Sequence, residues 1–387
     1  MKRVGMWVTL IALVYGVLEA ISATGLYLVG RLHDWHYQPV DELTDFQAAS
    51  IGRLLDDTSK YVMPDPELGW TIRPNGVAPL YQANSAGMRR TGEVDALPAP
   101  GVHRIAAYGD SFTHGDQVAN ADTWSARVEA LAPEFELLNF GVGGYGVDQA
   151  YLRYQRTQRE FPVELVLIGF MSENIKRHVN RYRPFYAIGT GMTLGKPRFV
   201  VRDGELELLP NPLPGAQDLR ALLAEPRAVL PRIGENDHFF AHRYRANALD
   251  WSPTYRLSQV IAHEMGASNP SRRLFDAAGD YRTDSEAFQI SVALIRAFVA
   301  RVQADGARPL VLVFPNRGDV ERFQTSGKRT YQALLEAFDA AGVDYVDLLP
   351  ALTADPLDDV FNMHYTPLGN SRVAEYLIPA LRARLTP

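Results

Sequence analysis

The sequence predicts a three-layer α/β domain with a flavodoxin-like, doubly wound parallel sheet, preceded by an N-terminal transmembrane helix. Three observations lead to this prediction. Short, almost wholly apolar segments alternate with amphipathic helical patterns from residue 104 onward. A long apolar run follows the basic pair Lys2-Arg3 at the N-terminus. The stretch at about 185–284 lacks the alternation, and we therefore expect it to be an insertion.

Strands and helices are expected to alternate along the main domain. The strands are expected at residues 104–108, 136–140, 164–170, 309–314 and 344–348. Helices are expected at 148–159, 285–304, 330–341 and 366–385, with a shorter one at 46–55. Strands that are apolar throughout are typical of a parallel sheet covered by helices on both faces. Right-handed crossovers between such strands give the doubly wound topology.

The chain is expected to divide into a membrane anchor at 1–30, a linker and N-terminal extension at 31–103, and the main domain at 104–387. Within the insertion, two strand-like runs flank Asp203-Gly204, which predicts a hairpin. An insertion after the third strand would lie near the carboxyl ends of the strands, where ligands bind in this architecture. We expect it to form a cap over a site; a peripheral decoration is the alternative.

The apolar run from Val4 to Gly30 is long enough to cross a hydrocarbon core of about 30 Å. Its positive flank predicts a cytoplasmic N-terminus, with the remaining chain on the periplasmic or extracellular side of a single span. A cleaved signal peptide, with Ala20-Ile21-Ser22 as a weak small-residue site, is the alternative. The apolar run continues past that point and favours an uncleaved anchor. Glu19 is expected to be a tolerated residue within the span; a contact with a partner helix, or snorkelling toward an interface, is the alternative.

Composition excludes several classes of chemistry. The 387-residue chain has no cysteine, which excludes disulfides, thiolate metal sites and cysteine nucleophiles. Its formal net charge is -6, so nothing global favours a nucleic-acid partner. His238 and His242 have the i, i+4 spacing of helical metal ligands, but no clear third ligand accompanies them. We therefore expect neither a metal nor a cofactor.

A candidate nucleophile follows the first strand directly, in Gly109-Asp110-Ser111. A glycine at a strand end permits a sharp turn that lifts a serine hydroxyl clear of the sheet edge. The next segment then presents backbone N–H groups where a negative oxygen would form. The alternative is that Ser111 only caps a helix. His114, three residues later, is expected to be a loop residue near the site.

The segment Asn139–Gly146 follows the second strand and contains a Gly-x-Gly-x-x-Gly pattern. This pattern can bind a dinucleotide when it follows the first strand of a βαβ unit. Here it follows the second strand, and no acidic residue ends the next strand, since Glu164 begins one. We therefore consider nucleotide binding a minor alternative. A purely structural turn is another.

Two further polar residues follow later elements. Asn174 comes after the third strand and offers side-chain N–H donors, which an ionised Glu173 does not. His364 lies past the last strand, just before a helix, where it can reach back across the strand ends. Taken alone, each has an ordinary structural explanation, as a turn asparagine and a structural histidine.

In order and topological position these four blocks resemble those of the GDSL/SGNH hydrolase superfamily. The resemblance covers about residues 104–175 and 305–387, and leaves out the insertion and the N-terminal extension. It implies that Ser111 is the nucleophile and His364 its general base. It also implies an oxyanion hole formed by Gly144, the backbone N–H of Ser111 and the Asn174 side chain.

The chain departs from the family pattern in its acid. The family usually places an aspartate two or three residues before the histidine, where this chain has Phe361-Asn362. Asp359 is the candidate for orienting the His364 imidazole and stabilising its charged form, and Asp358 is second. A dyad without a carboxylate is the remaining alternative.

A second departure concerns the third block. The family's Gly-x-Asn-Asp appears here as Ser172-Glu173-Asn174-Ile175. If Asn174 were matched to the final aspartate of that motif, Glu173 would occupy the asparagine position. Asn174 is preferred because only an amide offers donors. The nearby basic residues, Arg177, His178, Arg181 and Arg183, are expected to form a solvated face, or alternatively to bind an anionic or sugar substrate.

The predicted function is hydrolysis of carboxylic esters, including acetyl esters, through a Ser-His(-Asp) acyl-enzyme. Small-molecule, glycan or lipid esters of a cell envelope are the expected substrates. O-acetyl transfer would use the same residues with a different acceptor. An inactive binding module of an envelope assembly is the alternative from another class.

Overall fold

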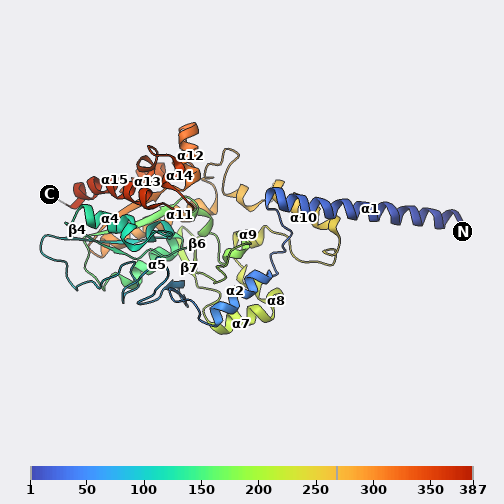
Figure 1. Cartoon of the computed structure of the whole chain (residues 1–387), viewed down its shortest axis with the longest axis horizontal. Helices are drawn as coiled ribbons and strands as arrows, with labels where there is room; N and C mark the ends of the chain where they lie inside the picture. The colour runs from blue at the N-terminus through green and yellow to red at the C-terminus, as the bar shows by residue number, and fades with distance from the viewer. Residues whose placement is uncertain (1, 267–268, 386–387) are drawn as a thin grey trace.

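The computed structural model describes residues 2–266 and 269–385. A parallel sheet with helices on both faces forms the main body of the molecule. Helix α1 (Lys2–His33) extends from this body as one long helix whose N-terminal end is free (Figure 1). The insertion lies between the sheet and this helix (Figure 1).

The central sheet has five strands in the order β4-β3-β5-β8-β9, and every neighbouring pair is parallel. The strands are β3 (His103–Tyr108), β4 (Phe135–Asn139), β5 (Leu165–Met171), β8 (Arg308–Phe314) and β9 (Tyr345–Asp347). Each predicted strand is present, with ends that differ by at most one residue from the prediction. In chain order the arrangement is 2-1-3-4-5, so the predicted flavodoxin-like topology is confirmed.

Alternate residues of each strand face opposite sides of the sheet and build two cores. One core contains Ala106, Val166 and Ile168 beneath α5, α11 and α13. The other contains Ile105, Ala107 and Leu167 beneath α4 and α15. These helices are α4 (Trp124–Leu131), α5 (Val147–Thr157), α11 (Glu286–Ala304), α13 (Gln332–Ala341) and α15 (Pro367–Leu385). Strands that are buried on both faces explain the continuous apolar runs in the sequence.

Shorter helices connect these elements or cap their ends. They are α3 (Ser111–His114), α6 (Asn174–Arg177), α12 (Arg317–Ser326) and α14 (Leu357–Val360), with single 3₁₀ turns at Asn120–Asp122, Arg183–Phe185, Pro270–Arg273 and Leu349–Leu352. The helices α3 and α6 follow β3 and β5 directly. They therefore place their side chains at the carboxyl edge of the sheet.

The N-terminal extension is folded onto the main domain. It contains α2 (Asp45–Leu55) and a hairpin of β1 (Val62–Asp65) and β2 (Gly69–Ile72). Trp70 and Ile72 of β2 are almost fully buried and belong to the core that α5 and α11 cover. The extension is therefore part of the domain's packing.

The insertion contains a hairpin followed by short helices. The hairpin pairs β6 (Arg198–Arg202) with β7 (Glu205–Leu209) about Asp203-Gly204, as predicted. The helices are α7 (Ala216–Ala224), α8 (Pro226–Ile233), α9 (His238–Ala241) and α10 (Pro253–Met265). Buried apolar residues of the hairpin and of α7–α9 join the core on the α5 and α11 side of the sheet. The insertion is thus built into the domain and continues its core.

Helices α1 and α10 pack side by side (Figure 1). Glu19 of α1 accepts hydrogen bonds from Ser252 Oγ (2.7 Å) and from the Thr254 N–H (3.0 Å). Ser22 accepts one from the Thr254 hydroxyl (2.9 Å), and Gly25 lies against Leu257. Glu19 therefore has specific partners in the insertion, which the sequence did not reveal.

Candidate active site

Ser111 begins α3, directly beyond the end of β3. Asp110 caps this helix, accepting a hydrogen bond from the Phe112 N–H (2.9 Å). Gly109 has no room for a side chain, because a Cβ would lie 2.0 Å from Thr113 Oγ1. Ser111 is 6% exposed, and within residues 2–266 and 269–385 neither its hydroxyl nor its N–H has a hydrogen-bond partner. The helix-cap alternative thus applies to Asp110, and the Ser111 hydroxyl stays free.

The glycine-rich segment after β4 forms a tight turn beside α3. The Tyr145 N–H bonds to the Val142 carbonyl (3.2 Å), and Gly144 has a φ of +84°. A β-turn with positive φ at its third residue favours glycine there. The preceding Val142 N–H bonds to the Gly109 carbonyl (3.0 Å), which ties the turn to the nucleophile's strand end. Among the described residues, the Gly144 N–H has no hydrogen-bond partner.

Residues outside the predicted blocks hold this turn. The indole of Trp70, in the N-terminal extension, donates to the Gly143 carbonyl (2.9 Å). The Tyr145 hydroxyl donates back to the Trp70 carbonyl (2.5 Å). Arg183 of the insertion places Nη1 2.9 Å from the position a Gly144 Cβ would take. No pattern in the sequence links Trp70 or Arg183 to this glycine turn, because both residues are distant from it along the chain.

The Asn174 amide points at Asp110. Its Nδ2 donates to Asp110 Oδ2 (3.0 Å) and, at 3.5 Å, to the Tyr145 carbonyl, while its Oδ1 accepts from the Met171 N–H (3.0 Å). Asn174 is fully buried. In this arrangement both functions of the amide are engaged by protein groups, so the expected oxyanion donor instead holds the residue that caps α3.

His364 lies against the nucleophile's helix. Its ring centroid is 5.0 Å from that of Phe112, and its backbone N–H donates to Gln117 Oε1 (3.1 Å). No hydrogen bond joins it to Ser111 within the described part of the chain. The Nδ1 atom of His364 is buried and has no partner among the described residues.

Asp359 does not bond to His364 in this structure. It lies in the short helix α14 and is exposed, and only its backbone carbonyl accepts a bond, from the Thr366 hydroxyl (2.5 Å). The second candidate, Asp358, pairs with Arg317 (2.6 Å). The carboxylate expected at His364 Nδ1 is therefore supplied by neither residue in this conformation.

A different carboxylate, that of Asp116, lies near His364. Its Oδ1 bonds to His114 Nδ1 (2.5 Å), and its Oδ2 lies 3.1 Å from where a Gly143 Cβ would stand. Its neighbour Gln117, which holds the His364 backbone, has a φ of +70°. Such a conformation is costly for a residue other than glycine and often marks functional segments. Sequence reasoning missed Asp116 because it lies outside the family blocks.

His114 connects Asp116 to the N-terminal extension. Its Nε2 shares a hydrogen bond with the Tyr61 hydroxyl (2.6 Å), and its side chain is almost fully buried. Burial lowers the pKa of His114 although Asp116 opposes the change. Burial would raise the pKa of the Asp116 carboxyl, but the charges of His114 and His364 hold it below its usual value. The expectation that His114 is a loop residue is wrong: it ends α3 and is buried.

The expected solvated basic face is also wrong for three of its four members. Arg177, His178 and Arg181 are all buried. Arg177 Nη1 bonds to Asp110 Oδ2 (3.2 Å) and to the Tyr145 carbonyl (2.6 Å), so it compensates the charge of the helix cap. Arg183 is half-buried beside Gly144. A buried carboxylate needs such a partner, which explains the burial of Arg177, whereas His178 and Arg181 bond to other groups.

The histidine pair in the insertion makes hydrogen bonds to the backbone. His238 Nε2 bonds to the Pro270 carbonyl (3.0 Å), and His242 Nδ1 bonds to the His238 carbonyl (2.7 Å). No cluster of three or more potential metal ligands occurs in the part of the chain that the structure describes.

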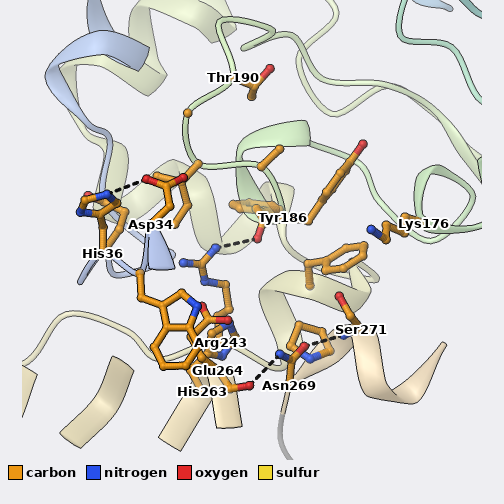
Figure 2. A pocket seen from close by; sticks show the side chains of 18 of the residues that line it. Asp34, His36, Lys176, Tyr186, Thr190, Arg243, His263, Glu264, Asn269 and Ser271 are labelled. Carbon is orange, nitrogen blue, oxygen red and sulfur yellow. Dashed lines mark hydrogen bonds and ion pairs between the residues drawn. The ribbon is translucent and has the colours of Figure 1, made fainter. Parts of the chain in front are cut away.

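A pocket of about 900 Å³ lies beside this site, between the C-terminal end of α1 and the insertion (Figure 2). Lys176, Tyr186 and Arg243 are among its lining residues. Ser111 and His364 do not line it. The Arg183 Nε bonds to the Tyr186 hydroxyl (3.1 Å), so the pair Arg183–Tyr186 separates the pocket from the Gly144 turn.

No family model matches the chain, and no curated protein sequence matches it. Among solved structures, it is similar to a member of the lipolytic G-D-S-L family from Veillonella parvula. That match has 10% identity and a TM-score of 0.35, and covers 73% of this chain and 100% of the other.

Two further solved structures are similar to this chain at comparably low sequence identity. A carbohydrate acetylesterase family member from Sinorhizobium meliloti has 11% identity and a TM-score of 0.31, with 73% of this chain and 99% of the other covered. An α/β hydrolase from the metagenome of Lake Arreo has 12% identity and a TM-score of 0.37, with 72% and 94% covered.

Proposed function

We propose that this chain is a serine ester hydrolase in which Ser111 and His364 perform acyl transfer through a covalent intermediate. The observation that supports this most is the free Ser111 hydroxyl at the carboxyl end of β3. It is flanked by the His364 segment and by the unpaired N–H groups of Ser111 and Gly144. Nucleophile, base and oxyanion donors are the groups that ester cleavage needs.

The steps follow from these groups. Ser111 Oγ attacks the ester carbonyl as His364 Nε2 removes its proton, which requires the two side chains to close to hydrogen-bond distance when substrate binds. The N–H groups of Ser111 and Gly144 stabilise the oxyanion of the tetrahedral intermediate. His364 then protonates the departing alcohol. Water attacks the acyl-enzyme, and the same residues release the acid and restore the hydroxyl.

Asp110 and Asn174 act by positioning in this proposal. Asp110 caps the N-terminus of α3. Asn174 and Arg177 both donate hydrogen bonds to Asp110, and Arg177 also donates to the Tyr145 carbonyl. This assembly links the helix of the nucleophile to the turn that contains Gly144. The amide of Asn174 would become an oxyanion donor only by exchanging its bond to Asp110 for one to the substrate.

We assign the support of the charged imidazole to Asp116, in preference to Asp359. The Asp116 carboxylate interacts electrostatically with His364 and is largely buried, so its charge is weakly screened. Asp359 is exposed and bonds to His364 through neither oxygen. The His364 Nδ1 atom has no carboxylate partner, so the reacting pair is a dyad beside a nearby charge.

Two alternatives to hydrolysis remain. One uses the same catalytic residues, and the other uses none of them for catalysis. O-acetyl transfer differs only in the acceptor, an alcohol of a glycan or lipid in place of water. An inactive binding module is favoured by the unpartnered His364 Nδ1. Hydrolysis of a nitrophenyl ester in the absence of an acceptor alcohol distinguishes both from a hydrolase.

The direct test is turnover of a short-chain nitrophenyl ester by the full chain in detergent. Ser111→Ala should lower kcat by about 10³-fold or more, because the nucleophile is lost. Ser326→Ala, at an exposed serine of α12, is the matched control and should keep wild-type activity. Equal activity in wild type and Ser111→Ala would refute the proposed nucleophile. No activity in wild type would leave the binding module as the better account.

We further propose that α1 anchors the chain in a membrane, with the main domain on the outer side. The helix segment Arg3–His33 has a mean hydropathy of 2.0 in its most apolar window, none of which is buried. The other apolar helix of comparable length, α11, is a core helix with 44% of its window buried. The docking of Glu19 and Ser22 on α10 supports a retained helix over a cleaved signal peptide. An intact mass that includes residues 1–30 is the expected result for protein taken from membranes.

A further inference from the structure

The insertion has an exposed apolar tip beside the middle of α1. Leu249 and Trp251 lie just before α10 and are 53% and 66% exposed. The Trp251 ring is 6.4 Å from that of Tyr15, which lies one helical turn below Glu19. Large apolar side chains exposed together on a protein surface commonly mark a contact with a partner or a membrane.

Hydrogen bonds hold the tip in shape. Asn247 Oδ1 accepts from the Leu249 N–H (2.9 Å), and the Leu249 carbonyl accepts from the Ser252 N–H (2.9 Å). Asp250, the one charged residue of the tip, accepts from the Asn247 N–H (2.9 Å) and from the Tyr37 hydroxyl. The Asp250 carboxylate and the N–H groups of Leu249 and Ser252 thus have partners within the protein, while the side chains of Leu249 and Trp251 are exposed.

The contacts between α10 and α1 show at which level along α1 the tip lies. Thr254 faces Ser22 and Leu257 faces Gly25, so α10 runs parallel to α1 and the tip is at its lower end. A hydrocarbon core of about 30 Å takes about 20 helical residues. A span that begins at Val4 thus ends at about residue 23, and Tyr15 and Glu19 lie in its outer half.

We propose that the loop Leu249–Trp251 inserts into the outer leaflet of the bilayer next to α1. The insertion then makes a second contact with lipid, and the catalytic domain is held at a fixed height above the membrane. Tryptophan and tyrosine favour the membrane–water interface, where Trp251 and Tyr15 would form a local aromatic pair. This inference rests on the proposed anchoring of α1.

The same placement brings the pocket of Figure 2 to the membrane surface. Its lining includes His33 and Trp35 at the top of α1, together with His263 near the upper end of α10. These residues lie about 20 Å above the level of Glu19, given about 1.5 Å per residue along α1. The pocket therefore opens just outside the lipid headgroups.

The absence of cysteine makes the test simple. Trp251→Cys and Leu249→Cys are labelled with an environment-sensitive nitrobenzoxadiazole maleimide in the full chain, reconstituted into phosphatidylcholine vesicles. Leu13→Cys in α1 reports insertion of the anchor. Leu97→Cys, which is 68% exposed and follows Ala96, a residue bonded to Arg104 at the start of β3, is the aqueous control.

Labels at 251 and 249 should emit at shorter wavelength than the label at 97 and lose most of their emission when doxyl-labelled phosphatidylcholine is included. If the label at 13 is quenched while 249 and 251 behave like 97, the proposed contact is wrong and the anchor stands. If the label at 13 is also unquenched, the anchor fails and the inference fails with it. Two label positions guard against one variant that misfolds.

Discussion

Among the single residues of the candidate site, His364 has the most informative surroundings. Its Nδ1 atom is buried and has no partner in the part of the chain that the structure describes, while its backbone is held by Gln117, a residue with positive φ. The carboxylate nearest in the chain, that of Asp359, is exposed and makes no hydrogen bond to His364 within the described residues. A charged imidazole forms during ester cleavage, so a nearby negative charge is valuable even without a hydrogen bond. In the proposed mechanism, Asp116 provides that charge.

The roles of the two aspartates can be separated by substitution. Asp116→Asn should lower kcat about tenfold with little change in KM, since about 1.4 kcal/mol of electrostatic stabilisation would be lost only when His364 is charged. Asp359→Asn should remain within about twofold of wild type, as expected for an exposed carboxylate. Steady-state kinetics well below the unfolding temperature measure both. A larger loss in Asp359→Asn would show that the loop of α14 closes on His364 during turnover.

Several residues of the candidate site could be proposed from the sequence because each follows a strand in an alternating pattern. Ser111, Gly144 and His364 were identified in this way, from turn chemistry and family resemblance. Trp70 and Arg183 were not, because their contacts join segments far apart in sequence and no local pattern encodes them. The burial of Arg177 was misjudged because its partner, Asp110, is a helix cap whose burial only the fold reveals, while His178 and Arg181 are buried against other groups.

At the scale of elements, the turn of Gly144 determines where the oxyanion would bind. Its φ of +84° suits glycine, and a Cβ there would meet Arg183 Nη1 at 2.9 Å and Trp70 Cζ2 at 3.3 Å. Gly306 has a nearly equal φ of +86° with open space around it. Alanine substitutions at the two positions therefore separate the energetic cost of a positive φ from the cost of crowding around Cβ.

Gly144→Ala should reduce kcat by about 10²-fold, because displacement of the turn moves an oxyanion donor. Gly306→Ala should leave kcat unchanged while lowering stability by about 1 kcal/mol, the cost of positive φ for alanine. Nitrophenyl ester kinetics and urea unfolding measure the two effects. Retention of wild-type kcat by Gly144→Ala would remove this turn from the proposed oxyanion hole.

His178 joins α5 to α11 in the core. Its Nε2 accepts from the Val147 N–H (3.2 Å), and its Nδ1 bonds to the Ser291 hydroxyl (2.7 Å). Burial lowers the pKa of His178 from 6.5 to about 4. The unfolded chain binds the proton of this histidine more tightly than the folded chain, so protonation favours unfolding. The free energy of unfolding therefore keeps its full value above pH 6.5 and decreases as the pH falls toward 4.

The free energy of unfolding should therefore decrease by about 2 kcal/mol from this residue alone between pH 7 and pH 5. His178→Gln, which cannot titrate, should show a correspondingly shallower dependence on pH. Urea unfolding of both proteins across this range measures the difference. Identical slopes for the two proteins would mean that His178 is not held neutral.

At the scale of the whole molecule, the sheet, the insertion and α1 are one connected structure. The order of strands and the hairpin of the insertion were predictable from apolar patterns and from turn residues. The helices of the insertion were not, because their apolar faces are short and pack against α1, α2 and the domain core in ways that only the tertiary structure specifies. Because α10 docks on it, helix α1 is a structural part of the molecule.

Ser111 is proposed to form the acyl-enzyme, and covalent trapping of the full chain by a fluorophosphonate tests this role most directly. We predict one adduct per chain by intact mass, located on the peptide that contains Ser111. Ser111→Ala should form no adduct, and His364→Ala should react far more slowly. An adduct on another residue, or ester turnover by wild type with Ser111 unmodified, would contradict this account.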